Sequence, residues 1–547
     1  MHSSLYFTLT LCFATLLALA APSSKSGIQK RSFIVKRVAS PRLKARDGVE
    51  EMAKAFNKYN IPVPRDLKNA VEKRQLKKRQ LAAANRVGKR SVSQRGPQRR
   101  DDMGGEQNVR LGLAASSSQR RSQLAHQRRD SMGGDQDVRL GLAASMGQRR
   151  SLHPRQDQDP AAEQTAATQQ PAAEAQAGNQ TQSKAQGGDQ NGSVEATPEK
   201  NDAEYLAPVK IGGQELVLDF DTGSSDLWVF NTQLKNQQPQ QPGLQTGGQS
   251  AQQSAQQAGQ LEKAIDSHTL YNPQQSQTFK EVPGLQFKIS YGDGSGAQGT
   301  VGMDIVEVGG VQAEQAVQLA TSVTGSFLQD SKNNGLMGLA FSKINTVKPE
   351  KQKTFFESVM PSLQEPVFTA DLRRNATGAY EFGTIDRSKF QGDMVFTPVN
   401  NSQGFWQFTS ERFAVGDGQP QQATAGGQAI ADTGTTLILA DKNIVQGYYS
   451  QVQGAQNNKE VGGVTIPCNQ QLPDLMLAVG DNMARVTGDQ INFAPIEDGS
   501  AECFGGIQAV PPGTMGIYGD IFFKSNFVAF QGGSNGQGPS LGFAQHA

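Results

Sequence analysis

The sequence predicts an all-β protein with an internal duplication, and two observations lead to this prediction. First, an Asp-Thr-Gly turn occurs twice, at residues 221–223 and 432–434, about 210 residues apart. Each copy follows a β-favouring run and precedes an apolar run, so each aspartate is expected at a loop tip backed by buried strands. Second, from Tyr205 onward short apolar runs alternate with glycine-bearing turns. One copy alone is equally well explained by an ordinary Asx turn, but two copies with matched flanks predict that two carboxylates meet.

Basic and acidic residues are unevenly distributed along the 547-residue chain. Lys and Arg number 53 and Asp and Glu number 51, but the cations concentrate in residues 1–160 and the acidic residues after them. A basic arm is often a nucleic-acid-binding feature, yet these cations stand as pairs between Gln, Ala and Ser without interleaved aromatics. We therefore expect no nucleic-acid partner.

The N-terminus has the pattern of a signal peptide over residues 1–20. Residues 5–20 are an apolar run that ends in small residues before Ala21 and Pro22, and the run is too short for a confident membrane span. The C-terminus lacks the hydrophobic tail of a GPI signal, so we expect a secreted, extracellular protein without an anchor. Cys468 and Cys503 then remain, either as a disulfide contributing about 3 to 4 kcal/mol or as two buried free thiols.

The next segment, residues 21–72, is expected to be a basic propeptide. It contains a strand-like run at 33–38 and a helical spacing over residues 48–59, which Pro62 and Pro64 end. Residues 73–200 are expected to be a low-complexity spacer, punctuated by dibasic pairs and carrying a 29-residue repeat, 99–116 and 128–145. The dibasic pairs indicate processing, and a charged linker that is never processed is the alternative.

The β-rich patterning begins at residue 201 and continues to the end. We divide it into residues 201–395 and 396–547, with a Gln-rich insertion at 236–260. Residues 287–302 are expected to form a long hairpin with a glycine-rich turn, and no Gly-Lys-Ser/Thr sequence follows that would bind phosphate. The candidate glycosylation sites are Asn179, Asn191, Asn375 and Asn400.

The chemistry available to the domain is that of paired carboxyl groups. His is scarce, so a Ser-His-Asp triad or a His-rich zinc site is poorly supplied, and we expect no metal and no cofactor. Two neighbouring carboxyls share one proton; the ionised one can activate a water while the protonated one donates to an amide carbonyl. Ser224 and Thr435, three residues beyond each aspartate, are placed to bond the carboxylates, and Thr222 and Thr433 to tie the loops. The alternative for these hydroxyls is an ordinary turn role.

Further motifs carry a resemblance to a known family. Besides the two Asp-Thr-Gly turns they are residues 291–295 (YGDGS), 335–341 (GLMGLAF), 404–408 (GFWQF) and 519–525 (GDIFFKS). Together they resemble the pepsin-like aspartic endopeptidases, and within them the secreted fungal subgroup. The resemblance implies a bilobal fold of two β-barrel-like lobes with the active-site cleft between them. It also implies that Asp221 and Asp432 are the catalytic dyad, stabilised by Gly223 and Gly434 in the turns.

The resemblance extends to residues around the dyad. Tyr291 matches the flap tyrosine, followed by Gly292 and Asp293, and Trp228 matches its hydrogen-bond partner; Asp293 implies tolerance of Lys at P1 beside apolar residues, and a simple turn residue is the alternative. Cys468 is implied to pair with Cys503. Asn334 and Tyr518 depart from the usual Asp and from the usual Leu or Phe.

The segment before the domain has an expected role in inhibition. The basic propeptide can lie across the acidic cleft, with Lys58 as the residue that reaches the dyad, or Lys58 is a solvated helix lysine. The expected partners are protein and peptide substrates, the chain's own propeptide and a kexin-like processing protease, and the enzyme is expected to be a monomer. A binding protein that no longer cleaves is the alternative from another class.

Overall fold

The computed structural model describes residues 47–93, 190–199, 202–236, 259, 261–291, 295–533 and 536–547. Contacts divide the chain into two units, residues 1–85 with 186–547 and residues 86–185, and the features discussed below lie in the first, apart from the end of one helix. The run at 33–38, the spacer repeat and Asn179 lie outside the described residues. In the part of the chain that is described, no helix is both long and apolar enough to cross a membrane.

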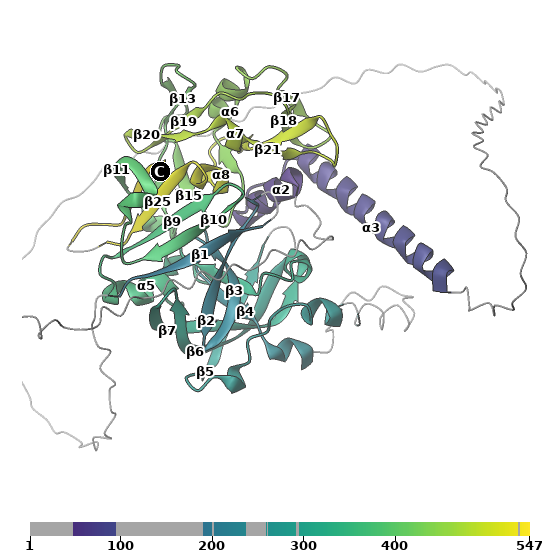
Figure 1. Cartoon of the computed structure of the whole chain (residues 1–547), viewed down its shortest axis with the longest axis vertical. Coiled ribbons are helices and arrows are strands. Elements are labelled where there is room, and N and C mark those ends of the chain that lie inside the picture. Colours follow the sequence, from purple (N-terminus) through teal and green to yellow (C-terminus); the bar gives the residue numbers. More distant parts are fainter. Residues whose placement is uncertain are drawn as a thin grey trace, which may run out of the picture. The chain divides into compact units, whose positions relative to one another are not determined.

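The largest β-sheet has 13 strands and combines strands from the beginning, middle and end of the domain (Figure 1). Their order is β11-β26-β25-β9-β10-β1-β2-β3-β8-β4-β7-β6-β5. The strands are β1 Gly192–Pro198, β2 Tyr205–Ile211, β3 Gln214–Asp221, β4 Leu227–Phe230, β5 Lys280–Ser290, β6 Gly296–Val308, β7 Val311–Thr324, β8 Gly335–Gly338, β9 Val367–Arg373, β10 Ala376–Phe382, β11 Phe390–Pro398, β25 Asn526–Gln531 and β26 Ser540–His546.

Three smaller sheets of five, four and four strands are built from the C-terminal part of the chain. Their strands are β12 Gln407–Thr409, β13 Arg412–Val415, β14 Gln421–Gln422, β15 Gln428–Ala431, β16 Ile438–Ala440, β17 Gln456–Asn458, β18 Gly463–Pro467, β19 Leu475–Val479, β20 Asn482–Val486, β21 Asn492–Pro495, β22 Glu502–Gly505, β23 Ile507–Ala509 and β24 Gly516–Tyr518. Short helices connect them and the large sheet: α5 Phe355–Val359, α6 Lys442–Tyr449, α7 Gly488–Ile491 and α8 Asp520–Phe523. The predicted mainly-β character is confirmed.

Two groups of strands repeat one pairing pattern. β3 is parallel to β8, β8 is antiparallel to β4, and β4 is parallel to β7. In the same way β15 is parallel to β24, β24 is antiparallel to β16, and β16 is parallel to β23. Because β3 ends on Asp221 and β15 ends one residue before Asp432, the two Asp-Thr-Gly turns occupy equivalent points of two related frameworks.

Strand β1 lies inside the segment that the sequence assigns to the spacer. It pairs with β10 on one side, where Gly192 is opposite Phe382, and with β2 on the other, where Pro198 is opposite Tyr205. Its side chains alternate between buried and exposed, as in a strand with one face on the core. The folded domain therefore begins before residue 201, near Gln190.

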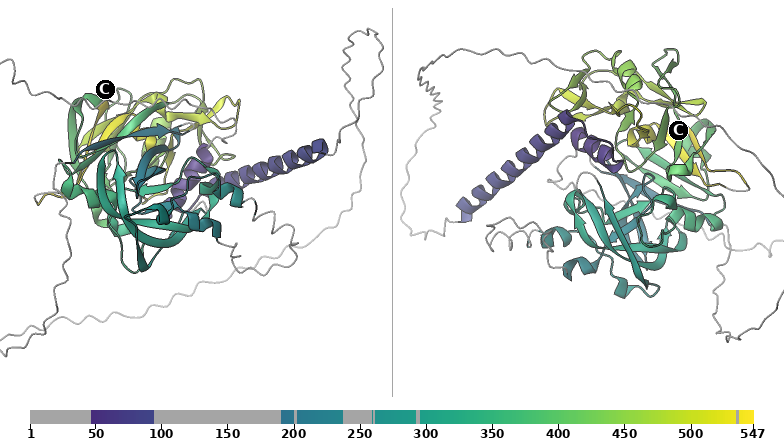
Figure 2. Two further views of the ribbon diagram at one scale, coloured as in Figure 1. Left: turned by 60° about the horizontal axis from the view of Figure 1, so that its bottom comes forward. Right: turned by 180° about the vertical axis from the view of Figure 1, so that it is seen from behind.

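Two helices precede the sheets and are drawn in purple in Figure 2. Helix α2 spans Gly48–Lys58, and its N-cap Asp47 accepts the backbone N–H of Glu50 at 3.0 Å. This agrees with the helix predicted over residues 48–59. Helix α3 spans Arg65–Ser93, so it enters the segment expected to be spacer. Its first turns bury few apolar residues between many cations, which explains why its periodicity is weak in the sequence.

Candidate active site

Asp221 and Asp432 lie next to each other in the interior, 1% and 0% exposed. The glycine of each turn faces the aspartate of the other turn. A Cβ atom on Gly223 would clash with Oδ1 of Asp432, and a Cβ atom on Gly434 would clash with Oδ1 of Asp221. Both turns therefore require glycine because the backbone approaches the opposite carboxylate so closely.

The threonines that follow the aspartates tie the two loops together. Thr222 Oγ1 donates to the carbonyl of Ala431 at 2.9 Å, and Thr433 Oγ1 donates to the carbonyl of Phe220 at 2.6 Å. Each hydroxyl also accepts the backbone N–H of the other threonine, at 3.0 and 3.2 Å. Both side chains are buried, so these four bonds hold the carboxylates at a fixed separation.

Each aspartate also receives two hydrogen bonds from its own loop. Asp221 accepts the N–H of Gly223 at 2.8 Å and the hydroxyl of Ser224 at 2.7 Å. Asp432 accepts the N–H of Gly434 at 3.0 Å and the hydroxyl of Thr435. These donors orient both carboxyl groups and favour their ionised forms.

The residues at the end of α2 contact both carboxylates. Lys58 Nζ donates to Asp221 Oδ1 at 2.7 Å and to both oxygens of Asp432 at 3.0 Å. The Tyr59 hydroxyl donates to Asp432 Oδ2 at 2.6 Å, and its ring packs edge-on against Phe405 with centroids 5.6 Å apart. Lys58 is thus a buried ion-pair partner, whereas a solvated helix lysine was its alternative.

The two carboxyl groups differ in acidity. Burial raises the pKa of Asp221 despite the opposing charge of Lys58. Burial also acts to raise the pKa of Asp432, but the Lys58 ammonium and hydrogen bonds from Asp221, Thr435 and Tyr59 outweigh it and lower that pKa to about 2. Burial by itself would lower the pKa of Lys58, and the two carboxylates more than compensate and raise it.

Comparison with known proteins identifies the family of this site. A profile described as eukaryotic aspartyl protease matches residues 204–546. The chain belongs to this family. It is 46% identical over 358 residues to aspergillopepsin-1 of Aspergillus fumigatus, covering 65% of this chain and 82% of the relative. It is also 46% identical over 358 residues, with the same coverage, to penicillopepsin-1 of Penicillium rubens, and 44% identical over 361 residues to penicillopepsin-2 of Penicillium janthinellum. The chain is therefore an aspartic endopeptidase, a peptide hydrolase, of the fungal pepsin-like group.

Tyr291, which the resemblance implies to be the flap tyrosine, directly follows β5. Trp228 Nε1 donates to the Tyr291 hydroxyl at 3.3 Å, and both rings make edge contacts with Phe327, at 4.9 and 5.2 Å. The backbone N–H of Tyr291 donates to the carbonyl of Ser295 at 2.8 Å, which closes the base of the hairpin. Gly292 and Asp293 lie outside the described residues.

The two departures from the family's pattern lie beneath the Asp-Thr-Gly loops. Asn334 Oδ1 accepts the N–H of Val217 at 3.0 Å, and its own N–H donates to the Val217 carbonyl at 2.8 Å, so its amide fixes β3 without a buried charge. Tyr518, in β24, accepts the N–H of Asp432 on its carbonyl at 3.1 Å, and its buried hydroxyl bonds Ser410 at 2.5 Å. Both residues are satisfied where they stand.

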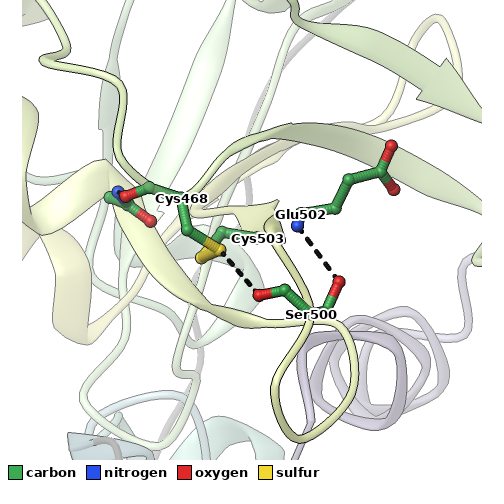
Figure 3. The surroundings of a disulfide bond; sticks show 5 residues. Cys468, Ser500, Glu502 and Cys503 are labelled. Carbon is green, nitrogen blue, oxygen red and sulfur yellow. Dashed lines mark hydrogen bonds between the residues drawn. A yellow bond between two sulfur atoms is a disulfide. The ribbon is translucent and has the colours of Figure 1, made fainter.

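The structure joins Cys468 to Cys503 as a disulfide, with Cα atoms 4.9 Å apart. Figure 3 shows the bond beside the turn where the Ser500 hydroxyl accepts the N–H of Glu502 at 3.0 Å. The alternative of two free thiols is thereby excluded for this structure. A helix drawn in purple passes beside the same turn (Figure 3).

Three contacts of the site were missed in the sequence. Tyr59 caps Asp432, Lys54 Nζ pairs with buried Glu204 at 2.6 Å, and the Thr436 hydroxyl donates to Glu51 at 3.1 Å. The available signal was the spacing of Glu51, Lys54 and Lys58 along α2, which places three charged residues on one helical face. Sequence reasoning assigned a role only to Lys58.

The remaining predicted positions lie at the surface. Asn191, Asn375 and Asn400 are exposed, and Asn375 occupies the turn between β9 and β10 with φ of 50°. Exposure is the condition that glycosylation requires. Within the described ranges no group of three His, Cys, Asp or Glu residues is arranged to hold a metal ion.

Proposed function

We propose that this protein is a secreted acid endopeptidase made as a zymogen, and that Asp221 and Asp432 activate the water that hydrolyses the peptide bond. The observation that carries the proposal is the matched pair of buried carboxylates, each held by a backbone N–H and a hydroxyl and tied across by two threonines. That arrangement holds two acidic groups close enough to share a proton once the lysine between them leaves.

The reaction follows from this sharing. With one proton between them, the ionised aspartate removes a proton from a water while the protonated aspartate donates to the substrate carbonyl oxygen. Water then adds to the amide carbon, and collapse of the tetrahedral species returns a proton to the leaving nitrogen. The state with a single shared proton exists at acid pH, which is why we expect acid activity.

Lys58 and Tyr59 supply the inhibition in the proposed zymogen. The ammonium replaces the shared proton between the carboxylates, and the phenol donates to Oδ2 of Asp432, the oxygen that also accepts the Thr435 hydroxyl. The ion pair with Lys58 requires Asp432 to be ionised, and Asp432 becomes protonated as pH falls toward its lowered pKa of about 2. Acid therefore weakens the closed form, in which Lys58 and Tyr59 occupy the dyad, because protonation of Asp432 removes one of its ion pairs.

The substrate cleft is proposed to lie between two β-barrel-like lobes and to be covered by the flap at Tyr291. Its P1 site is proposed to prefer apolar side chains, with tolerance of Lys through Asp293. If Asp293 has this role, its replacement by Ser should lower cleavage after Lys more than cleavage after Phe or Leu, measured with matched peptides.

Maturation completes the proposal. The signal-like residues 1–20 and the disulfide support secretion, and the dibasic pairs of the spacer support cutting by a kexin-like protease. Because β1 is paired on both sides, the mature chain is proposed to retain the residues from Gln190 onward. The mature enzyme is proposed to act as a monomer on protein substrates.

The deciding experiment compares hydrolysis of a denatured protein at about pH 4 and at pH 7. Wild type is expected to cleave only at acid pH, and Asp221→Asn and a statine-type inhibitor should each abolish the activity. Lys58→Ala should release activity from the uncut chain at a pH where wild type is silent. Lys68→Ala is the matched control, since Lys68 lies exposed on α3.

Each result has a direct reading. If the uncut Lys58→Ala chain is as inactive as the uncut wild type, Lys58 has no part in the inhibition. Failure of a folded, processed wild-type sample to cleave at any pH would instead favour the alternative, an extracellular binding protein on this scaffold.

A further inference from the structure

One face of α3, outside the catalytic site, is seated on the domain. Leu67 and Ala70 are 0% and 1% exposed, and Val71, Arg74 and Lys78 are half-buried. These positions recur at intervals of three and four residues, so they form one stripe along the helix. The other residues of this part of the helix, among them Lys68 and Arg79, are exposed.

The surface beneath this stripe is built next to the disulfide. A Cβ atom on Gly462 would clash with the backbone of Leu67, and one on Gly48 would clash with the ring of Phe504, the neighbour of Cys503. Phe504 is buried in the same apolar cluster as Leu67. The α2–α3 segment therefore packs so closely on this surface that no side chain fits between the two backbones at Gly462. This contact does not involve the dyad.

Charged groups complete the contact. Arg74 Nε donates to the N-cap carboxylate of Asp47 at 2.6 Å, and its Nη2 donates to the Ile496 carbonyl at 3.2 Å. The Arg74 side chain is 15% exposed, so these bonds are worth more than the solvated pairs Lys77–Glu497 and Lys73–Glu460. Arg74 thus locks α3 to the start of α2 and to the domain at once.

We propose that α3 is a second anchor, and that residues 47–80, called here the docked segment, stay bound as a non-covalent inhibitor after the chain is cut in the spacer. The inference rests on the proposed zymogen and adds a surface to it, namely Gly462, Ile496 and Phe504. Lys58 blocks the dyad, and the α3 contact keeps Lys58 in place when the covalent link is lost. Activation then requires release or destruction of the docked segment.

The same contact gives the dibasic pairs different fates. A protease of the dibasic-specific kind binds its substrate in an extended conformation and cuts after the pair. The Arg74–Gln75 bond lies in a helix, and Arg74 is held by two partners. This bond is therefore closed to cutting while α3 is docked. The pairs that follow α3, beginning with Arg99–Arg100, carry the processing instead.

The test uses the full chain with one recognition sequence for a highly specific protease inserted between Ser116 and Ser117. After cutting at pH 7, the N-terminal fragment should coelute with the domain on size-exclusion chromatography, and mass spectrometry should show that a dibasic-specific protease leaves the Arg74–Gln75 bond intact. Arg74→Ala should increase the rate at which the fragment dissociates by about tenfold. Arg79→Ala, on the exposed side of the same helix, should leave it unchanged.

A second variant guards against misfolding. Leu67→Ala removes an apolar contact with the domain and keeps every charge, and it should accelerate dissociation at least as much as Arg74→Ala, about tenfold or more. Separation of the wild-type fragment at pH 7, cutting after Arg74, or equal rates for Arg74→Ala and Arg79→Ala would each overturn the inference. Loss of acid peptidase activity in the uncut chain would count against the proposed function instead, so the two failures are distinguishable.

Discussion

The two Asp-Thr-Gly loops are alike in construction and unlike in their state. In each, the aspartate accepts from the amide two residues ahead and from the hydroxyl three residues ahead, and a threonine reaches across to the other loop. Yet the pKa of Asp221 is raised and that of Asp432 is lowered to about 2. The loops themselves are nearly symmetric, but the contacts placed between them are not, since the Lys58 ammonium and the Tyr59 hydroxyl both help to lower the pKa of Asp432.

The largest difference in contacts is Tyr59. Lys58 reaches both aspartates, but the Tyr59 hydroxyl donates to Asp432 alone, and Lys58 touches both oxygens of Asp432 and one of Asp221. On acidification Asp221 therefore accepts a proton before Asp432 does. The docked segment therefore adds to the asymmetry, because Lys58 and Tyr59 join the Asp221 and Thr435 hydrogen bonds in favouring the ionised form of Asp432.

The strongest way to break the symmetry is to remove one carboxylate. Asp221→Asn and Asp432→Asn should each reduce acid peptidase activity by about 10³-fold or more, because both members are needed for one shared proton. Exposed Asp417→Asn should have no effect. Initial rates on one peptide at pH 4 test this, and substantial activity in either dyad variant would show that the loops do not act as a pair.

The next prediction concerns the ties between the loops. Thr222→Val and Thr433→Val each leave a carbonyl and an N–H of the opposite loop without a partner in the interior, so each should lower the free energy of unfolding by about 2 kcal/mol. Urea unfolding at pH 7 measures the effect, with exposed Thr269→Val as control. If the two variants lose clearly different amounts of unfolding free energy, the two threonines do not contribute equally, although their hydrogen bonds are alike.

The smallest expected effect sharpens the comparison. Tyr59→Phe removes one donor from Asp432, so its pKa in the closed form should rise toward the ordinary value. A lowered pKa stabilises the closed form above the ordinary aspartate pKa, and this stabilisation is lost as pH falls toward 2. Because the pKa of Asp432 is lowered less in Tyr59→Phe, the uncut variant should become active at a pH about half a unit higher than the uncut wild type. A midpoint equal to that of wild type in a pH series would contradict the assignment.

Much of the site could be predicted from the sequence because its signals are local. The repeated turn, the hydroxyls three residues after each aspartate and the pair Cys468 and Cys503 are read directly, and the structure places them together as expected. The sequence also indicates Lys58 as the residue that reaches the dyad. Its neighbour Tyr59 is not indicated, because a phenol contacting a carboxylate depends on the angle at which α2 enters.

The features that could not be predicted depend on partners distant in the chain. Residues 192–198 lack strong β propensity and read as the end of a polar spacer, and only the flanking strands β10 and β2 make them a strand. The first turns of α3 have few apolar residues, so the helix becomes recognisable only against the surface around Gly462. In both cases the secondary structure is determined by contacts with distant parts of the chain, and the local composition does not indicate it.

Strand β1 has a practical consequence for anyone producing the enzyme by recombinant expression. A shortened gene that starts at residue 201, where the composition changes, would omit the strand that lies between β10 and β2. The shortened protein would also lack the buried side chains of Val194 and Ala196. The two newly exposed edges would be prone to pair with other chains during refolding. A gene that starts at or before Gln190 keeps the sheet continuous, and solubility trials of the two versions side by side would reveal the difference.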